Sequence, residues 1–294
     1  LVPWVDANLR TLADRGHRAI AGLSQGGFGA MSYAARHPDA FGLAGSMSGA
    51  PEIDRDPIVI PFSSAIISAT ATGLDGVEPD AMFGNRVLHE INWQAHDPAT
   101  LTENLRWTDM YMWTGDGVPG PLDTGTPDPG AITIEGITHV STVLFHSHLQ
   151  QAGIPSHYTD YGSGTHTWPY WSRDFAQFID PLMSAFANPA PTPTTITYQS
   201  ADAHWLQWGW SVAHTGGGFS TLSLANSAGF RTRMAGSLVV TTPPFYVPGS
   251  SHLVAVTRGS STAITHLNAD AAGRLHISVP GGLVASTATV LVGG

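Results

Sequence analysis

The strongest chemical signal in the sequence is a serine set between glycines. Gly22-Leu-Ser-Gln-Gly26 lies between an apolar run at 17–23 and a run with helical spacing at 26–36. A sharp strand-to-helix turn of this kind exposes the serine hydroxyl, and glycines at both flanks remove Cβ atoms that would collide. We therefore predict that Ser24 is a nucleophile and that the backbone N–H of Gln25 is one oxyanion-hole donor. The alternative is a glycine-rich turn with an ordinary N-cap serine.

A serine nucleophile needs a general base, and His166 is the best placed of the 14 histidines. It lies in a loop directly after an expected strand at 156–161, where the histidine of such hydrolases follows both the serine and the acid. Three aromatic residues follow it and either line an acyl or sugar site or pack the loop. They are Trp168, Tyr170 and Trp171. The other candidate use of histidine is a metal site on an expected helix at 134–151, from His139, His146 and His148, but no carboxylate shares their face at ligand spacing.

Two acidic residues between the serine and the histidine could orient the base. Asp116 follows an expected strand at 107–113, which is where a hydrolase sheet usually carries its acid. Glu135 stands at the start of the expected helix at 134–151. Position alone favours Asp116.

The elements around these residues alternate between strand and helix. The strand at 17–23, the helix at 26–36 and a second buried strand at 41–47 form a strand–helix–strand unit of a parallel sheet. The segment 50–105 reads as a long helical or loop excursion. Residues 1–16 have the apolar spacing of one amphipathic helix.

The chain divides into two units of different composition. Of the 22 acidic residues, 20 lie before residue 195, and prolines at alternating positions make 188–194 a semi-rigid linker. We therefore assign 1–187 to a catalytic α/β domain. Residues 195–294 contain short β-branched runs separated by Gly and Pro turns, which is typical of a β-sandwich. Its closely spaced Trp205, Trp208 and Trp210 form either an exposed glycan-binding strip or part of the core.

The composition excludes several classes of function. All 12 basic residues are arginine and the net charge is −10, so the chain lacks the basic face that nucleic acid requires. The absence of cysteine removes disulfides and thiolate chemistry. No apolar run is long enough to span a membrane, and the chemistry above needs no cofactor and no metal.

Several segments together resemble the mycolyltransferase family of secreted serine esterases, within the esterase D-like α/β-hydrolases. The resemblance spans residues 2–186. The segments that carry it are Trp4-Val-Asp-Ala-Asn8, His37-Pro38, Ala44-Gly-Ser-Met-Ser48, Met82-Phe-Gly84 and Gly164-Thr-His-Thr-Trp-Pro-Tyr-Trp171. In that family the acid is a glutamate in a segment that corresponds to Ile134-Glu-Gly-Ile-Thr138, so the resemblance moves the acid to Glu135 and leaves Asp116 as the rival. Two features depart from the family, the lack of cysteines and the unit from 195 onward.

The resemblance implies a function. A Ser–Glu–His triad would cleave an acyl ester through an acyl-enzyme and release the acyl group to water, or to an acceptor such as a sugar, trehalose in the family, or a cell-envelope lipid. A polyester or lipid esterase without transferase activity is the first alternative. A non-catalytic cell-surface binding protein on a hydrolase scaffold is the second. The family and the Lys-free composition indicate a secreted or cell-envelope location.

The resemblance also raises a question about the sheet. In an α/β-hydrolase the strand before the nucleophile is central, but here only 16 residues precede the strand that starts at 17. We therefore expect the N-terminal strands of the sheet to be missing from this chain. An upstream polypeptide of roughly 100 residues would complete the sheet.

Overall fold

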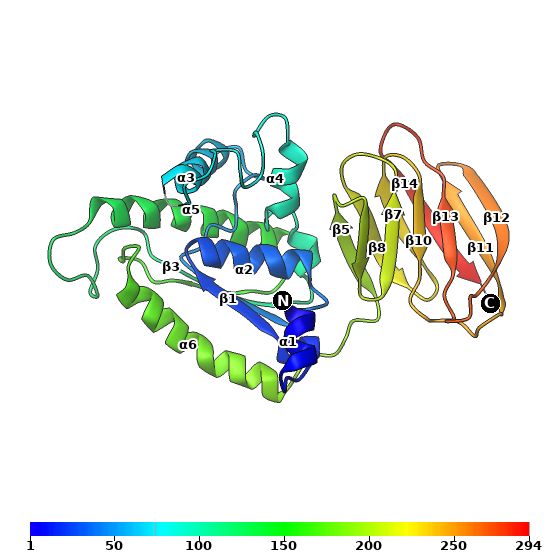
Figure 1. The fold of residues 1–294 in the computed structure, drawn as a ribbon, viewed down its shortest axis with the longest axis horizontal. Helices are drawn as coiled ribbons and strands as arrows, with labels where there is room; N and C mark the ends of the chain where they lie inside the picture. The colour runs from blue at the N-terminus through cyan, green and yellow to red at the C-terminus, as the bar shows by residue number, and fades with distance from the viewer. Residues whose placement is uncertain (74, 294) are drawn as a thin grey trace. The chain divides into compact units, whose positions relative to one another are not determined.

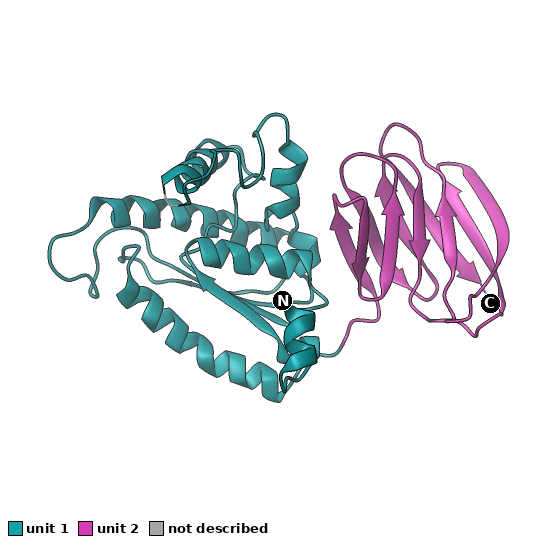
Figure 2. Ribbon diagram, in the orientation of Figure 1, with its two compact units in different colours: residues 1–191 teal, residues 192–294 magenta. Residues whose placement is uncertain are grey.

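The computed structural model describes residues 1–73 and 75–293, which form two compact units (Figure 2). The first unit is Leu1–Pro191 and the second is Thr192–Gly294. The boundary between them falls inside the proline-rich stretch 188–194. Each unit has a hydrophobic core of its own.

The first unit is built on a four-stranded parallel sheet in the order β1-β2-β3-β4. The strands are β1 (Ala19–Leu23), β2 (Leu43–Met47), β3 (Asp109–Thr114) and β4 (His157–Asp160). Every residue of β2 is buried, because β2 has a paired strand on either side. In contrast, β1 is only partly buried and forms one edge of the sheet.

Helices cover both faces of this sheet (Figure 1). Two helices on one face are α2 (Gln25–Arg36) and α5 (Pro129–Gln151), and α6 (Trp168–Ala187) covers the other. The remaining helices are α1 (Val2–Asn8), α3 (Ile60–Gly73), α4 (Glu90–His96) and two short 3-10 helices, Arg15–His17 and Thr102–Leu105. The expected strand–helix–strand unit is present as β1, α2 and β2.

Three helices differ from the sequence expectations. The helix expected over the first 16 residues ends at Asn8, and Trp4 and Leu12 are exposed, so no amphipathic face packs there. Helix α5 begins at Pro129 rather than at 134, because Asp128 caps it by accepting the N–H of Gly130. Helix α6 is not among the helices expected from the sequence, and it contains an internal proline, Pro181, a residue that is unfavourable in a helix interior.

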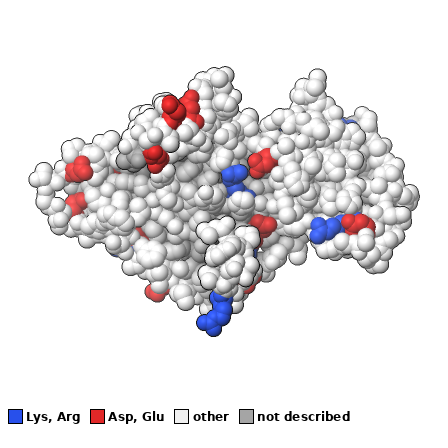
Figure 3. All heavy atoms as spheres, in the orientation of Figure 1, with Lys and Arg blue, Asp and Glu red and all other residues white. Residues whose placement is uncertain are grey.

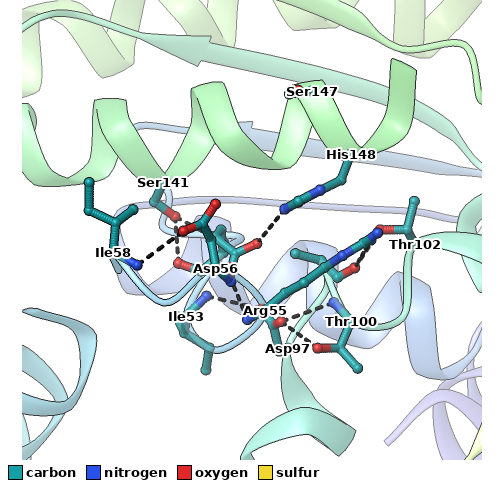
Figure 4. A network of polar contacts seen from close by, with 12 residues as sticks. Ile53, Arg55, Asp56, Ile58, Asp97, Thr100, Thr102, Ser141, Ser147 and His148 are labelled. Carbon is teal, nitrogen blue, oxygen red and sulfur yellow. Dashed lines mark hydrogen bonds and ion pairs between the residues drawn. The ribbon is translucent and has the colours of Figure 1, made fainter. Parts of the chain in front are cut away.

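A buried polar network fastens the segment after β2 to α5 (Figure 4). The Ser141 hydroxyl accepts the Glu52 N–H and donates to the Glu52 carbonyl, both at 2.9 Å. The Glu52 carboxylate accepts the N–H groups of Arg55 and Asp56 and lies 3.2 Å from Nε2 of His148. Burial, with the nearby Asp97 charge, raises the pKa of Glu52 to about 8.

The second unit consists of two antiparallel sheets, β13-β10-β7-β6 and β12-β11-β14-β9-β8-β5. Side chains from both sheets form one hydrophobic core. In chain order, the strands are β5 (Ile196–Ser200), β6 (His204–Gln207), β7 (Trp210–His214), β8 (Ser220–Asn226), β9 (Gly229–Met234), β10 (Leu238–Thr241), β11 (Ser251–Arg258), β12 (Ser261–Asn268), β13 (His276–Val279) and β14 (Ser286–Gly293).

The tryptophans of the second unit are not an exposed strip. Trp205 and Trp210 are buried in the core, and the indole N–H of Trp205 donates to Ser220. Trp208 and Gly209 both have positive φ and form the two-residue turn between β6 and β7. The interpretation of these residues as a glycan-binding strip is therefore wrong.

Charged side chains are sparse on the molecular surface. On the face drawn in Figure 3, acidic and arginine residues form separate small spots among uncharged residues. In residues 1–73 and 75–293, no helix is both long enough and apolar enough to cross a membrane.

Candidate active site

Ser24 lies in the sharp turn between β1 and α2. Its φ of 52° and ψ of −125° are a strained conformation for a residue with a side chain, and its N–H donates to the Met47 carbonyl at 2.9 Å. A Cβ on Gly22 would lie 2.3 Å from the main chain of Gly26, so residue 22 must be glycine. The expectation that the glycine at position 26 also avoids a collision was wrong, because a Cβ on Gly26 would meet nothing within 4 Å. The second tight position is Gly27, whose Cβ would lie 2.7 Å from the Ser46 hydroxyl.

The structure brings Ser24, His166 and Glu135 together from three distant segments. His166 Nε2 lies 2.8 Å from Ser24 Oγ, and His166 Nδ1 lies 2.7 Å from Glu135 Oε2. The His166 side chain is 7% exposed and the Glu135 side chain is completely buried. With Nδ1 protonated, His166 donates to Glu135 and leaves Nε2 to accept the Ser24 hydroxyl proton.

Helix α5 positions Glu135 in its second turn, on the face that packs against the sheet. Apart from Ser141, the buried residues of α5 recur every three or four positions, which is the spacing of one helix face. Oε1 of Glu135 accepts the Ser48 hydroxyl at 2.8 Å and the Gly115 N–H at 2.7 Å. The Tyr161 hydroxyl lies 3.5 Å from the same oxygen. Burial and the Glu135 charge raise the pKa of Tyr161, which keeps its hydroxyl protonated.

Asp116 is not brought to His166. It is half-buried, its N–H donates to the Gly162 carbonyl, and its Oδ1 accepts the Val118 N–H at 2.8 Å. These contacts make Asp116 a turn residue after β3. Of the two acids left open by position, Glu135 is the one next to the histidine.

Asp123, which was not among the residues expected at the site, fixes the loop that carries His166. Its carboxylate accepts the hydroxyl of Thr165, the hydroxyl of Tyr170 at 2.9 Å and the N–H of Gly120 at 2.7 Å. Burial alone would raise the pKa of Asp123, but these hydrogen bonds lower it. No local pattern marks Asp123, because two of its partners lie more than 40 residues away.

The three aromatic residues after His166 occupy different environments. Tyr170 is completely buried, its ring stacks on Tyr161, and it packs the loop rather than lining an open site. The ring of Trp171 meets His166 edge-on at 4.8 Å between centroids. Trp168 packs on Trp171 and is 68% exposed, so it is the one of the three free to contact a substrate.

The remaining candidate residues are Gln25 and the three histidines of α5. Gln25 is the first residue of α2, where backbone N–H groups have no partner within the helix. The three histidines of α5 have separate partners, because His139 pairs with Asp160, His146 with Ser156 and His148 with Glu52. No group of three metal-binding side chains forms in the part of the chain that the structure describes.

The first unit is similar in sequence to known proteins. The sequence profile of the family described as putative esterase matches residues 1–180. The chain is 33% identical over 190 residues to the MPT51/MPB51 antigen of Mycobacterium tuberculosis, covering 63% of this chain and 58% of that protein. It is 31% identical over 183 residues to the diacylglycerol acyltransferase/mycolyltransferase Ag85B of Mycolicibacterium smegmatis, covering 62% of this chain and 54% of that protein.

The similarity extends to three dimensions. The crystal structure of Mycobacterium tuberculosis MPT51 (FbpC1) aligns with a TM-score of 0.53 and 27% identity, covering 63% of this chain and 65% of that one. The chain thus spans less than two thirds of the length of these relatives. The first unit, a parallel sheet with helices on both faces, shares its fold with that structure and is of the α/β-hydrolase type. With a family match over more than half its length, the chain belongs to the putative esterase family and is mycolyltransferase-like.

Proposed function

We propose that this protein is a serine esterase or acyltransferase that acts through Ser24, His166 and Glu135. The observation that carries the proposal is the continuous hydrogen-bonded path from Ser24 Oγ through both nitrogens of His166 to Glu135 Oε2. Membership of the esterase family supports the same reaction class.

The reaction has two steps. Ser24 Oγ attacks the ester carbonyl as His166 Nε2 takes its proton, and the Gln25 N–H stabilises the oxyanion. The tetrahedral intermediate collapses, the alcohol leaves with the proton from His166, and an acyl-enzyme remains. Water or an acceptor hydroxyl then attacks that acyl group while His166 removes its proton. The bond from Ser24 Oγ to the acyl carbon breaks as His166 returns this proton to Ser24 Oγ, which releases the acid or the new ester. Glu135 stabilises the imidazolium in both steps.

For the second step we propose transfer to a sugar or lipid hydroxyl in competition with water. The similarity to a protein named as a diacylglycerol acyltransferase/mycolyltransferase supports transfer. Hydrolysis alone, as in a lipid or polyester esterase, is the second candidate. It is favoured by the partly exposed serine turn, which leaves water access to the acyl group. We also infer a secreted or cell-envelope location, in keeping with lipid or envelope acceptors.

The free edge of the sheet at β1 supports the proposal that a further polypeptide segment binds there. Strand β1 pairs with β2 alone among the described residues. A groove of about 760 Å³ beside β1 is lined mainly by apolar side chains of α1, β1 and α6. We infer that one more extended polypeptide segment pairs with β1 and covers this groove. Native mass spectrometry of the active protein should find that segment, and a fully active, isolated 294-residue chain would contradict it.

Labelling with a fluorophosphonate probe tests the proposed activity. The wild type should be labelled at Ser24 and should hydrolyse p-nitrophenyl esters. Ser24→Ala should lose both properties, with a fall in turnover of roughly a million-fold, as for a serine protease nucleophile. His166→Ala should behave in the same way. If either variant kept turnover within tenfold of wild type, the assignment of that residue to the triad would be wrong. A folded wild type that is not labelled would favour a binding protein on a hydrolase scaffold.

A second experiment distinguishes transfer from hydrolysis. If the enzyme is a transferase, added trehalose should divert acyl groups from water.

A further inference from the structure

Two adjacent residues at the end of β2 contact both sides of the proposed triad. The Met47 carbonyl accepts the Ser24 N–H at 2.9 Å. The Ser48 hydroxyl donates to Glu135 Oε1 at 2.8 Å. The end of β2 therefore holds the nucleophile turn through one residue and the acid through the next.

Ser48 makes its contact from an unfavourable backbone conformation. It is completely buried and has a φ of 50°, in the left-handed region that a residue with a side chain adopts only at a cost in free energy. Its N–H donates to the Trp113 carbonyl at 2.8 Å, which fixes this conformation. The neighbouring position 49 has no room for a side chain, because a Cβ there would lie 2.2 Å from the Ser46 hydroxyl and 2.8 Å from the main chain of Gly27. A glycine at position 48 would remove the strain but also the hydroxyl.

The hydroxyl of Ser48 donates to the carboxylate oxygen of Glu135 that is not paired with His166. Oε1 receives short hydrogen bonds from Ser48 and from the Gly115 N–H, and the hydroxyls of Thr114 and Tyr161 are farther away at 3.4 and 3.5 Å. With Oε1 held in this way, Oε2 faces His166 Nδ1. Removal of the Ser48 hydroxyl would leave the Gly115 N–H as the one short hydrogen bond to Oε1. A single hydrogen bond would not prevent rotation of the Glu135 carboxylate.

We propose that Ser48 is a positioning residue that fixes the Glu135 carboxylate for His166. It acts through Glu135 and touches no reacting atom. This inference rests on the proposed esterase function and deepens it. Its role had no signal in the sequence, although Ser48 closes one of the segments that resemble the mycolyltransferases.

The test is a double-mutant cycle in the full chain between position 48 and Glu135, measured on a p-nitrophenyl ester. Ser48→Ala and Ser48→Gly should each lower kcat roughly 10- to 100-fold with little change in KM, since each loses a hydrogen bond to a charged group. In the Glu135→Gln background the same changes should have almost no further effect, because their action passes through that carboxylate. Ser32→Ala is the matched control. Ser32 is also buried and donates to the His96 carbonyl at 2.7 Å, away from the site.

The possible results separate the two proposals. Ser48 variants that keep wild-type kcat, or that lose the same factor in both backgrounds, would overturn the positioning role, since a merely structural serine acts equally in both. If Ser48→Ala does not fold, Ser48→Gly still decides the question, because glycine tolerates the positive φ. A wild type that neither turns over esters nor reacts with a fluorophosphonate would overturn the proposed function, and this inference with it.

Discussion

At the scale of single residues, the geometry separates two acids that look equivalent in the sequence. Glu135 is buried beside His166 and receives donors on its other oxygen, whereas Asp116 is used to close a turn after β3. A carboxylate stabilises an imidazolium only when it lies next to the ring and cannot be screened by water. The different environments of the two acids therefore predict different consequences of neutralising them.

Glu135→Gln should lower kcat roughly 10³- to 10⁴-fold, as the loss of the triad acid does in a serine protease. Asp116→Asn should leave kcat close to wild type, because an amide oxygen can still accept the Val118 N–H. Steady-state kinetics on one soluble ester, with circular dichroism to verify folding, compares the two variants. A larger loss for Asp116→Asn would return the acid to the end of β3.

At the scale of elements, the turn between β1 and α2 depends on one glycine above the others. Gly22→Ala should destabilise the first unit by about 1–3 kcal/mol, as overpacking does, and abolish turnover, because its Cβ would meet the main chain of Gly26. Gly29→Ala is the control. Its Cβ meets nothing within 4 Å on α2, and alanine adds up to about 1 kcal/mol of helix propensity there. Urea unfolding measures both changes, and equal stabilities of the two variants would contradict the role of Gly22.

The contact between the segment after β2 and α5 should depend on pH. The folded-state pKa of Glu52 is raised from 4.5 to about 8, chiefly by burial, so the folded protein holds a proton that the unfolded chain releases. The stability from this group is complete below pH 4.5 and is lost as the pH rises toward about 8. His148, Asp97, Asp56 and Arg55 all face or adjoin this carboxyl group.

Glu52→Gln should therefore raise Tm relative to wild type at about pH 8 and change it little at about pH 5. The glutamine oxygen can still accept the Arg55 and Asp56 N–H groups, and the amide N–H can donate toward His148. Glu78→Gln, at an exposed position, is the control for loss of one acid. Thermal unfolding across this pH range gives the comparison. A difference in Tm that does not grow with pH would show that Glu52 titrates normally in the folded protein.

At the scale of the whole molecule, all three proposed triad residues belong to the first of two units that have separate cores. Loss of the second unit therefore leaves the core around the proposed triad residues unchanged. Removal of 192–294 should leave kcat/KM on a small soluble ester near wild type. Calorimetry of the full chain should show two unfolding transitions. A folded truncated protein without esterase activity would show that the second unit takes part in the site.

The sequence alone determined the nucleophile candidate, the base candidate and the change of composition near residue 190, because each depends on local patterns. A serine between glycines, a histidine after a strand and a proline-rich stretch can all be recognised without knowing what lies opposite them. Glu135 needed either a family resemblance or the structure, since two acids satisfied the local rules. The roles of Asp123 and Ser48 came from the tertiary structure alone. The side chains that they hydrogen-bond lie 42 to 87 residues away along the chain, and only the packing of the loops and α5 against the sheet brings them within reach.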